Sequence, residues 1–429
     1  MLLNPDEFDQ NSAFKHLEFL CKNIGNRLSG SIGESKAAEY IADRFREVGK
    51  PIIEKYPHSY YEGIEANITE LETGFRVSGK PMWMTKNTPE KGLEAEGLYL
   101  GSINQINRIT EKDIEEKIVF VFFSRDYFEP ELFRQLKTLY FMKPKGVVIL
   151  STYHKEVLRS DPFLEENSIF SIIPTILVPA SKFISKIKRV DLGKFLLVVK
   201  GERKTGQLCN TSLKIEGKKQ NIIVICAHHD TVEYAQGASN NASGVSIILE
   251  LARRLSAKKP NFTYVFASFG GEEQGHYGVK KFLEDSDTED IILCLNFDTI
   301  YPLPGFVASI VVGDETLFKI VQDVDLNNPY PAMSVNSTSN GGSNMIFAEK
   351  GIPSIMHMIR GTTNYGIDRT ELDVISEDLL DSLGTLGKYG IRLINRLDSM
   401  AEIEFSTGIP QNLEEEVENY FNRLNFYRN

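Results

Sequence analysis

A chain of 429 residues is longer than a single hydrophobic core usually supports, so two or three domains are expected. Its formal net charge of −11 argues against the broadly basic surface that nucleic acids or anionic membranes require. The first residues do not resemble a secretory signal, and no run approaches the roughly 18 apolar residues of a membrane span. We therefore expect a cytoplasmic, soluble protein whose partners include neither nucleic acid nor membrane.

The first half of the chain predicts two helices followed by a separate domain. Helical patterns fall within residues 12–50, and a polar turn separates them. Arg27 and Gly30 in this turn are candidates for lining a site, although a plain helix-to-helix connection is the favoured interpretation. From about residue 75 to 205, short β-rich runs alternate with turns around a helical pattern. We interpret 75–205 as an inserted, smaller α+β domain that shapes a cleft or binds a partner.

The second half alternates strand and helix patterns. Apolar runs at 222–227, 264–269 and 291–297 predict three strands. Helical patterns at 245–255 and 279–283 lie between them. This alternation is typical of an α/β domain with a mixed, largely parallel central sheet flanked by helices. We assign residues 1–74 and 206–429 to that domain.

The end of the chain predicts a further strand at 354–359, a long helix at 379–394 and an acidic helix at 413–424. We expect the acidic helix to pack on the body of the domain, with a contact between copies in a homo-oligomer as the alternative. The four cysteines lack paired spacing. Cys226 and Cys294 fall inside predicted strands, so we interpret both as small apolar core residues.

Ionisable side chains follow each of the three strands directly. The first strand is followed by His228, His229 and Asp230, the second by Glu272 and Glu273, and the third by Asp298. In open α/β sheets, ligands bind outside the carboxyl ends of the strands, so these side chains can converge on one site. Imidazole and carboxylate groups are the ligands of a hydrolytic zinc centre, which also needs a free carboxylate as a base.

The residue types suggest a division of roles. His228 and Asp298 supply two ligands for one ion, and Asp230 can receive the other imidazole N–H and fix the tautomer of the ring. Glu272 and Glu273 are adjacent, so one can bind metal while the other faces the substrate as the general base.

Several motifs resemble the zinc aminopeptidases that share a fold with glutamate carboxypeptidase, glutaminyl cyclase and the transferrin receptor ectodomain. The similar stretches lie at residues 26–31, 227–230, 237–244, 271–275, 296–298 and 347–353. Segment 75–205 is similar, more loosely, to the protease-associated domain that some members carry as an insertion. The resemblance implies a di-zinc exopeptidase fold.

The resemblance also implies roles for individual residues. His228 and Asp298 match ligands of one zinc ion, Glu273 matches a ligand of the second, Glu272 matches the general base, and Asp230 matches the carboxylate that orients the histidine. Three positions depart from the family pattern. The bridging aspartate is replaced by Asn240, the last histidine ligand by Gly366, and a common aspartate near the final strand by Ser343.

These departures argue against two ions. Two divalent ions about 3.5–4 Å apart repel one another, and a bridging carboxylate offsets the repulsion. We therefore expect one weakly bound zinc ion or none. His357 can move into the gap at Gly366, although a packed strand histidine is the favoured interpretation. The same loop can also offer a carboxylate ligand from Asp368, Glu371 or Asp373, although a solvated loop is the favoured interpretation of these three residues.

Two functions remain open from the sequence. The first is an aminopeptidase-type exopeptidase that hydrolyses a peptide or small amide substrate with an altered or single-metal site. The second is a catalytically inactive family member that acts as a binding or assembly protein. Single-zinc chemistry like that of glutaminyl cyclase fits poorly. The resemblance implies three ligands for such a site, and two of them are absent here.

Overall fold

The computed structural model describes residues 3–123, 130–151, 171–184, 191–338, 341–364 and 366–428. The chain forms two compact units. The first unit comprises Met1–His58 and Thr205–Asn422, and the second comprises Ser59–Lys204 and Arg423–Asn429. Among the described residues, no helix has both the length and the apolar character needed to cross a membrane.

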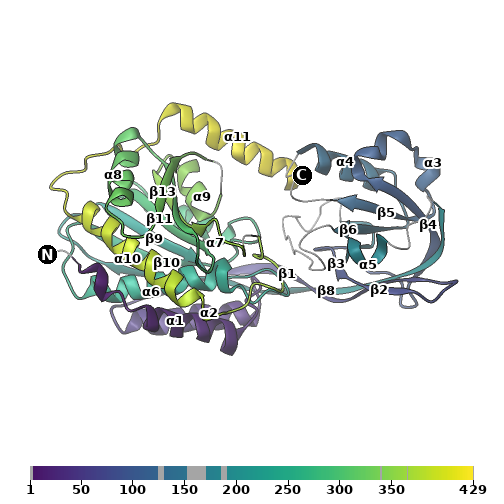
Figure 1. The fold of residues 1–429 in the computed structure, drawn as a ribbon, viewed down its shortest axis with the longest axis horizontal. Helices are drawn as coiled ribbons and strands as arrows, with labels where there is room; N and C mark the ends of the chain where they lie inside the picture. Colours follow the sequence, from purple (N-terminus) through teal and green to yellow (C-terminus); the bar gives the residue numbers. More distant parts are fainter. Residues whose placement is uncertain are drawn as a thin grey trace. The chain divides into compact units, whose positions relative to one another are not determined.

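A mixed sheet runs through the first unit (Figure 1), in the strand order β13-β12-β14-β11-β9-β10-β8. Parallel pairing joins β10 to β9, β9 to β11, β11 to β14 and β12 to β13, whereas β12 and β14 are antiparallel, as are β8 and β10. The strands are β8 (Asp191–Ile215), β9 (Ile222–His228), β10 (Thr263–Phe269), β11 (Ile291–Ile300), β12 (Phe306–Val312), β13 (Ala332–Asn336) and β14 (Ser354–Arg360). The expected mixed, largely parallel sheet flanked by helices is confirmed.

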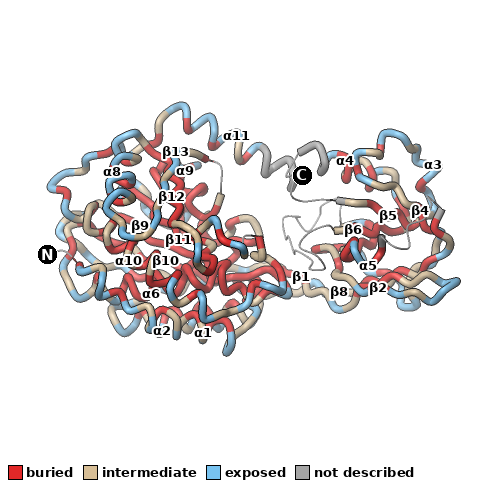
Figure 2. The backbone as a smooth tube through the Cα atoms, viewed as in Figure 1, coloured by how far each residue is buried: buried red, intermediate tan, exposed pale blue. Residues whose placement is uncertain are grey.

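Helices of this unit pack on the sheet and on one another. The helical segments are η1 (Pro5–Glu7), α1 (Gln10–Glu18), η2 (Phe19–Ile24), α2 (Ile32–Arg46), η5 (Ala238–Ala242), α6 (Ser243–Ser256), α7 (Tyr277–Asp285), α8 (Glu315–Leu326), α9 (Ser343–Glu349), α10 (Leu379–Asp398) and α11 (Gln411–Arg428). Helix α6 contacts α1, α10, β9 and β11, whereas α9 contacts α7, β9, β11 and β14. Figure 2 shows the strands as largely buried and the outer helices as partly exposed.

The site lies above well-buried strands. Strand β9 is buried from Ile223 to His228, and every residue of β11 except Thr299 is buried. Such continuous burial is expected of a parallel strand that helices cover on both faces. The hydrophobic core below the site includes Ile225, Val245, Leu295 and Phe297. The strand ends are thus held in place by a packed core.

The second unit contains the remaining strands of the sheet and has its own core. Strands β4, β5, β6 and β7 are parallel neighbours, β3 pairs antiparallel with β7, and residues 191–197 of β8 pair antiparallel with β4. The rings of Phe120, Phe183 and Phe195 contact one another in its core. Its elements are β1 (Ile52–Glu70), which begins in the first unit, β2 (Arg76–Ser78), β3 (Lys80–Pro81), β4 (Leu93–Ser102), η3 (Ile103–Arg108), α3 (Glu111–Ile114), β5 (Lys117–Phe123), α4 (Pro130–Phe141), β6 (Gly146–Ser151), β7 (Thr175–Pro179) and α5 (Ala180–Ile184).

Candidate metal centre

Three neighbouring strands bring the ionisable residues together. Strand β10 pairs in parallel with β9, so that Phe269 lies opposite His228, and β11 pairs in parallel on the other side of β9. The carboxyl ends of all three strands therefore lie at one edge of the sheet. Close to one another at this edge, His228, Glu272 and Glu273 each offer a ligand atom within 4.8 Å of the other two.

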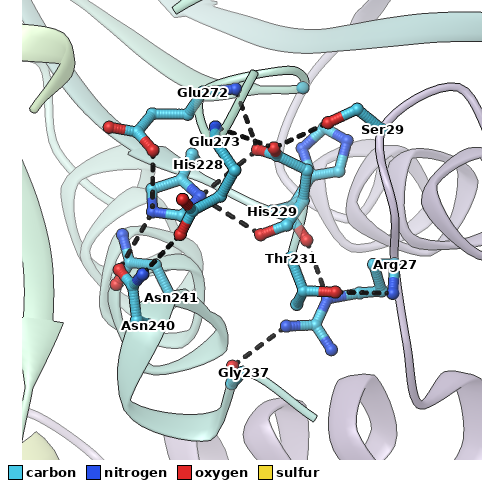
Figure 3. Close-up of polar contacts among 12 residues, drawn as sticks. Arg27, Ser29, His228, His229, Thr231, Gly237, Asn240, Asn241, Glu272 and Glu273 are labelled. Atoms are coloured by element: carbon cyan, nitrogen blue, oxygen red, sulfur yellow. Dashed lines mark hydrogen bonds and ion pairs between the residues drawn. The ribbon is translucent and has the colours of Figure 1, made fainter. Parts of the chain in front are cut away.

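Asp230 organises the turn that follows β10. Its Oδ1 accepts a hydrogen bond from the backbone N–H of Glu272 at 3.1 Å, and its Oδ2 accepts from that of Glu273 at 3.0 Å. The Ser29 hydroxyl donates to the same Oδ2 at 2.8 Å. Asp230 Oδ1 also lies 3.3 Å from Nδ1 of His228. One buried carboxylate thus positions the histidine and both glutamates. Figure 3 shows His228, Glu272 and Glu273 close together in the site.

The other nitrogen of His228 faces three oxygen atoms. Nε2 lies 3.2 Å from Oδ1 of Asn240, 3.6 Å from Oδ1 of Asp298 and 3.7 Å from Oε2 of Glu272. With a proton on Nδ1, a neutral ring would present a lone pair to three acceptors, which is unfavourable. Either a second proton or a metal cation between these atoms resolves the conflict.

Glu272 is buried with one oxygen atom unpaired. Its Oε2 has no hydrogen-bond partner among the described residues, although only 4% of the residue is exposed. Its Oε1 lies 3.2 Å from Nδ1 of His276, the residue before α7. A buried carboxylate oxygen without a donor is costly unless a ligand, a water molecule or an ion completes it. This oxygen atom therefore marks the reactive side of the site.

Glu273, in contrast, is fully paired by protein groups. Its Oε1 accepts a hydrogen bond from Nδ2 of Asn240 at 2.6 Å, and its Oε2 accepts from Nε of Arg369 at 2.5 Å. Both bonds are charge-assisted when Glu273 is ionised. Because the Asn240 amide nitrogen is committed to Glu273, its oxygen is the atom that faces His228.

Asn240 is held from its backbone as well as from its side chain. The backbone N–H groups of Ser239 and Asn240 donate to the carboxylate of Asp373 at 2.7 and 3.0 Å. The Thr299 hydroxyl lies 3.2 Å from Oδ1 of Asn240 and 2.9 Å from Oδ1 of Asp298, so its one proton is shared between these two acceptors. The loop before α6 is therefore tied both to the end of β11 and to the loop after β14.

Mutual charges shift the pKa values of this cluster. Burial lowers the pKa of His228, but Glu272 and Asp298 outweigh it and raise that pKa well above the usual value. Burial would raise the pKa of Glu272, but His228 and His276 lower it below the usual range. Burial raises the pKa of Glu273, and Arg369 opposes that shift. Burial also raises the pKa of Asp373, to about 6.

The donor set fits one small divalent ion. In a tetrahedral zinc site with bonds of about 2.0–2.1 Å, neighbouring ligand atoms are roughly 3.3–3.4 Å apart. The separations of 3.2 and 3.6 Å from Nε2 of His228 to Asn240 and Asp298 are close to that spacing. A second ion beside Glu273 does not fit, because the oxygen atoms of Glu273 already accept hydrogen bonds from Asn240 and Arg369.

The remaining predicted residues lie in different surroundings. Gly366 has a φ of 87°, and its N–H donates to the Tyr301 hydroxyl at 3.1 Å, so it provides backbone geometry and no ligand. Ser343 is buried at the start of α9, and its Oγ has no hydrogen-bond partner among the described residues. His357 accompanies Phe297 and Tyr389 in the core, with Nδ1 2.9 Å from the Ser309 hydroxyl.

The loop carboxylates also separate. Asp373 is fully buried against the loop before α6, and Asp368 accepts a hydrogen bond from the Tyr301 hydroxyl, so neither is a solvated loop residue. Glu371 is exposed. The favoured interpretation of a solvated loop is therefore wrong for Asp373 and Asp368, because both accept hydrogen bonds that fix the loop.

Sequence reasoning overlooked two functional candidates. Arg369 is the only lysine or arginine between residues 361 and 373, and that isolation in a loop next to a predicted site was the available signal. His276 follows Glu272 by four residues, and His and Glu at this spacing can meet across one helical turn.

A second buried network, formed by Arg27 and Glu34, fixes the loops next to the site. Arg27 is 0% exposed and donates to five backbone carbonyls, those of Leu20, Gly25, His229, Gln236 and Gly237. Glu34 accepts from the N–H groups of Gly30 and Cys209. Arg27 thus joins the turn after η2 to the loop after β9, as Figure 3 shows for Gly237.

Comparison with known proteins finds a family model that matches part of this chain. Residues 210–386 match Peptidase family M28. Aminopeptidase YwaD of Bacillus subtilis is 23% identical over 66% of this chain and 60% of its own length, and human Carboxypeptidase Q is 23% identical over 80% and 76%. The chain thus spans less than two thirds of the first of these relatives.

A solved structure resembles almost the whole chain. The zinc aminopeptidase BSAP from Bacillus subtilis superposes with a TM-score of 0.73 at 18% identity, covering 95% of this chain and 99% of that one. Such a likeness establishes the fold, and the match over residues 210–386 includes every strand end described above. Together these findings show that residues 210–386 are similar to peptidase family M28 and that the chain has the fold of a zinc aminopeptidase.

Proposed function

We propose that this protein is a metal-dependent exopeptidase of the aminopeptidase type, which hydrolyses a peptide or small amide substrate with an altered or single-metal site. The observation that carries the proposal is the unpaired, buried Oε2 of Glu272 at 3.7 Å from Nε2 of His228. The match of residues 210–386 to Peptidase family M28 and the similarity to a relative named as an aminopeptidase support a peptidase-like reaction.

The residues present would hold zinc as follows. His228 and Asp298 would be ligands, and the Asn240 carbonyl oxygen faces the same nitrogen of His228. When bound, a zinc ion supplies a Lewis acid that makes water a nucleophile near neutral pH. Asp230 holds the imidazole through Nδ1, which leaves Nε2 directed into the site.

Glu272 would act as the general base and then as the general acid of the reaction. Its Oε2 is free to take a proton from the attacking water and to return it to the leaving amine. Because His228 and His276 lower its pKa, Glu272 is ionised at neutral pH, which is the form that a general base requires. His276 Nδ1 lies 3.2 Å from Oε1, at the other end of the carboxylate.

A direct test measures zinc content and hydrolysis on the same preparation. Purified protein is equilibrated with micromolar free zinc, and aminoacyl and short peptide amides are offered as substrates. Zinc-dependent release of the N-terminal residue supports the proposal, and His228→Ala should abolish both zinc binding and release. Less than about 0.2 ion per chain together with no hydrolysis would overturn it.

The second candidate is a binding or assembly protein without catalysis. The replacement of two ligand positions, by Asn240 and Gly366, favours it. The same experiment separates the two candidates, because a protein without catalysis would hydrolyse none of the substrates with zinc bound.

We further propose that the second unit is a protease-associated-like insertion, and a partner captured by the isolated second unit would test its role.

A further inference from the structure

The pairing of Glu273 differs in kind from that of the other site carboxylates. Each oxygen atom of Glu273 receives a hydrogen bond from a side chain, at 2.6 Å from the Asn240 amide and at 2.5 Å from the Arg369 guanidinium. The exposed fraction of Glu273 is 1%, so these donors replace water. A carboxylate with this environment has its charge balanced within the protein and needs no metal cation.

The two donors are chemically complementary. An aspartate at position 240 would place a second carboxylate against Glu273, and two carboxylates at hydrogen-bond distance need a proton or a cation between them. The Asn240 amide removes that need by donating from Nδ2. The guanidinium of Arg369 supplies the positive charge on the other oxygen of Glu273. Asn240 and Arg369 thus serve the two oxygen atoms of one carboxylate.

The loop around Arg369 is built to hold this side chain in place. Arg369 has a φ of 61°, a conformation that a residue with a side chain adopts only where its surroundings hold it. The preceding residue, Asp368, accepts from the Tyr301 hydroxyl, which in turn accepts from the N–H of Gly366 at 3.1 Å. Four residues later, Asp373 accepts from the backbone of Ser239 and Asn240. Protein contacts therefore anchor the loop on both sides of Arg369.

We propose that Arg369, together with the Asn240 amide, takes the place of a second divalent cation at Glu273, so that this centre binds one ion and not two. The one-ion part deepens the proposed function and rests on it, whereas the role of Arg369 stands on the contacts of Glu273 alone. The ion lies on the side of His228 and Asp298, and Glu273 is a structural carboxylate paired with arginine. A divalent cation and Arg369 therefore exclude one another at Glu273.

The test counts ions per chain by elemental analysis after equilibration with micromolar free zinc. Wild-type protein should hold no more than one ion that His228→Ala removes, which separates the centre from adventitious surface binding. Glu273→Gln should leave that content unchanged. The double variant Asn240→Asp with Arg369→Gln should gain about one further ion, because it restores a carboxylate pair and removes the competing cation. Its melting temperature should rise on adding zinc by more than that of the wild type.

A matched control makes the same change of charge elsewhere. Asn336→Asp with Arg360→Gln alters net charge equally at positions outside the site, and it should bind no extra ion. Two ions in the wild type that both depend on His228 or Glu273 would overturn the proposal. So would a folded double variant, judged by its circular dichroism, that gains no ion. If the double variant does not fold, the wild-type count and Glu273→Gln decide the question.

The outcomes for the proposed function and for Arg369 are distinct. Wild-type zinc below about 0.2 ion per chain would remove the proposed function and the one-ion part. The double variant would then decide the role of Arg369, with a gain of ions supporting it and no gain overturning it. Hydrolysis is measured separately, and a loss of activity alone bears only on the proposed function.

Discussion

The carboxylate of Asp230 accepts a hydrogen bond from the backbone N–H of Glu273 at 3.0 Å, across 43 residues of sequence. Through this contact and its counterpart to Glu272, the segment after β9 sets the conformation of the turn after β10. Because Asp230 fixes the backbone of both glutamates, their side chains can face in different directions. Oε2 of Glu272 has no hydrogen-bond partner among the described residues, whereas both oxygen atoms of Glu273 are paired. The first prediction concerns this contact.

Asp230→Asn should destabilise the protein by about 2–4 kcal/mol, because the amide places a donor against a buried N–H or the Ser29 hydroxyl. Urea unfolding followed by circular dichroism measures the change. Ser29→Ala removes one donor to Asp230 and should cost only about 1 kcal/mol. Equal effects of the two variants would contradict the central role of the carboxylate.

Arg27→Lys should destabilise the protein by about 3 kcal/mol or more, since an ammonium group cannot serve five carbonyls that a guanidinium fork satisfies. The measurement is the free energy of unfolding in urea. Arg46→Lys is the matched control, because Arg46 is 52% exposed and pairs only with Asp43 among the described residues. That control should change stability by less than about 0.5 kcal/mol.

Glu272→Gln should lower kcat of the zinc-loaded protein by about 10²–10⁴-fold, because the amide cannot accept the proton from water. Zinc content should not fall, since His228 and Asp298 remain. Glu284→Gln, at an exposed surface carboxylate, serves as the control for the change of charge. Loss of zinc from Glu272→Gln would show that Glu272 is a ligand and not the base.

His357 predicts a pH dependence of stability. Burial lowers its pKa from 6.5 to about 3, so between these values the unfolded chain binds a proton that the native protein does not. Stability is therefore lost as pH falls from about 6.5, by up to about 1.4 kcal/mol per pH unit from this residue. His357→Asn keeps an acceptor for the Ser309 hydroxyl and should flatten the slope. Wild type and variant should run parallel above pH 7, and an unchanged slope below it would contradict the prediction.

The native thiols should be unreactive. All four cysteines are buried and free, and burial raises the pKa of Cys21 to about 12 and that of Cys209 to about 11. Thiolate is the nucleophile, so a disulfide reagent at pH 8 should label none of them until denaturant is added. Rapid labelling of a folded sample would show that one of these sites opens.

Local pattern was enough to predict the strands of the site. The apolar runs at 222–227, 264–269 and 291–297 correspond to β9, β10 and β11, because continuous apolar runs that end in polar residues report burial of a strand along the chain. The missed elements are β12, α8 and β13. Strand β12 runs antiparallel to β14 in a sheet that is otherwise mostly parallel, and such pairing joins segments whose sequences carry no mark of it.

The sequence by itself determined that His228, Asp298 and the two glutamates meet at one edge of a sheet, and that Asn240 and Gly366 stand where ligands are expected. Only the tertiary structure decided what replaces those ligands. Arg369 reaches Glu273 across 96 residues of chain, from a loop with a positive φ that Asp368 and Asp373 anchor. Periodicity reports which face of a strand or helix is buried, whereas the partner of a buried charge depends on the path of distant loops.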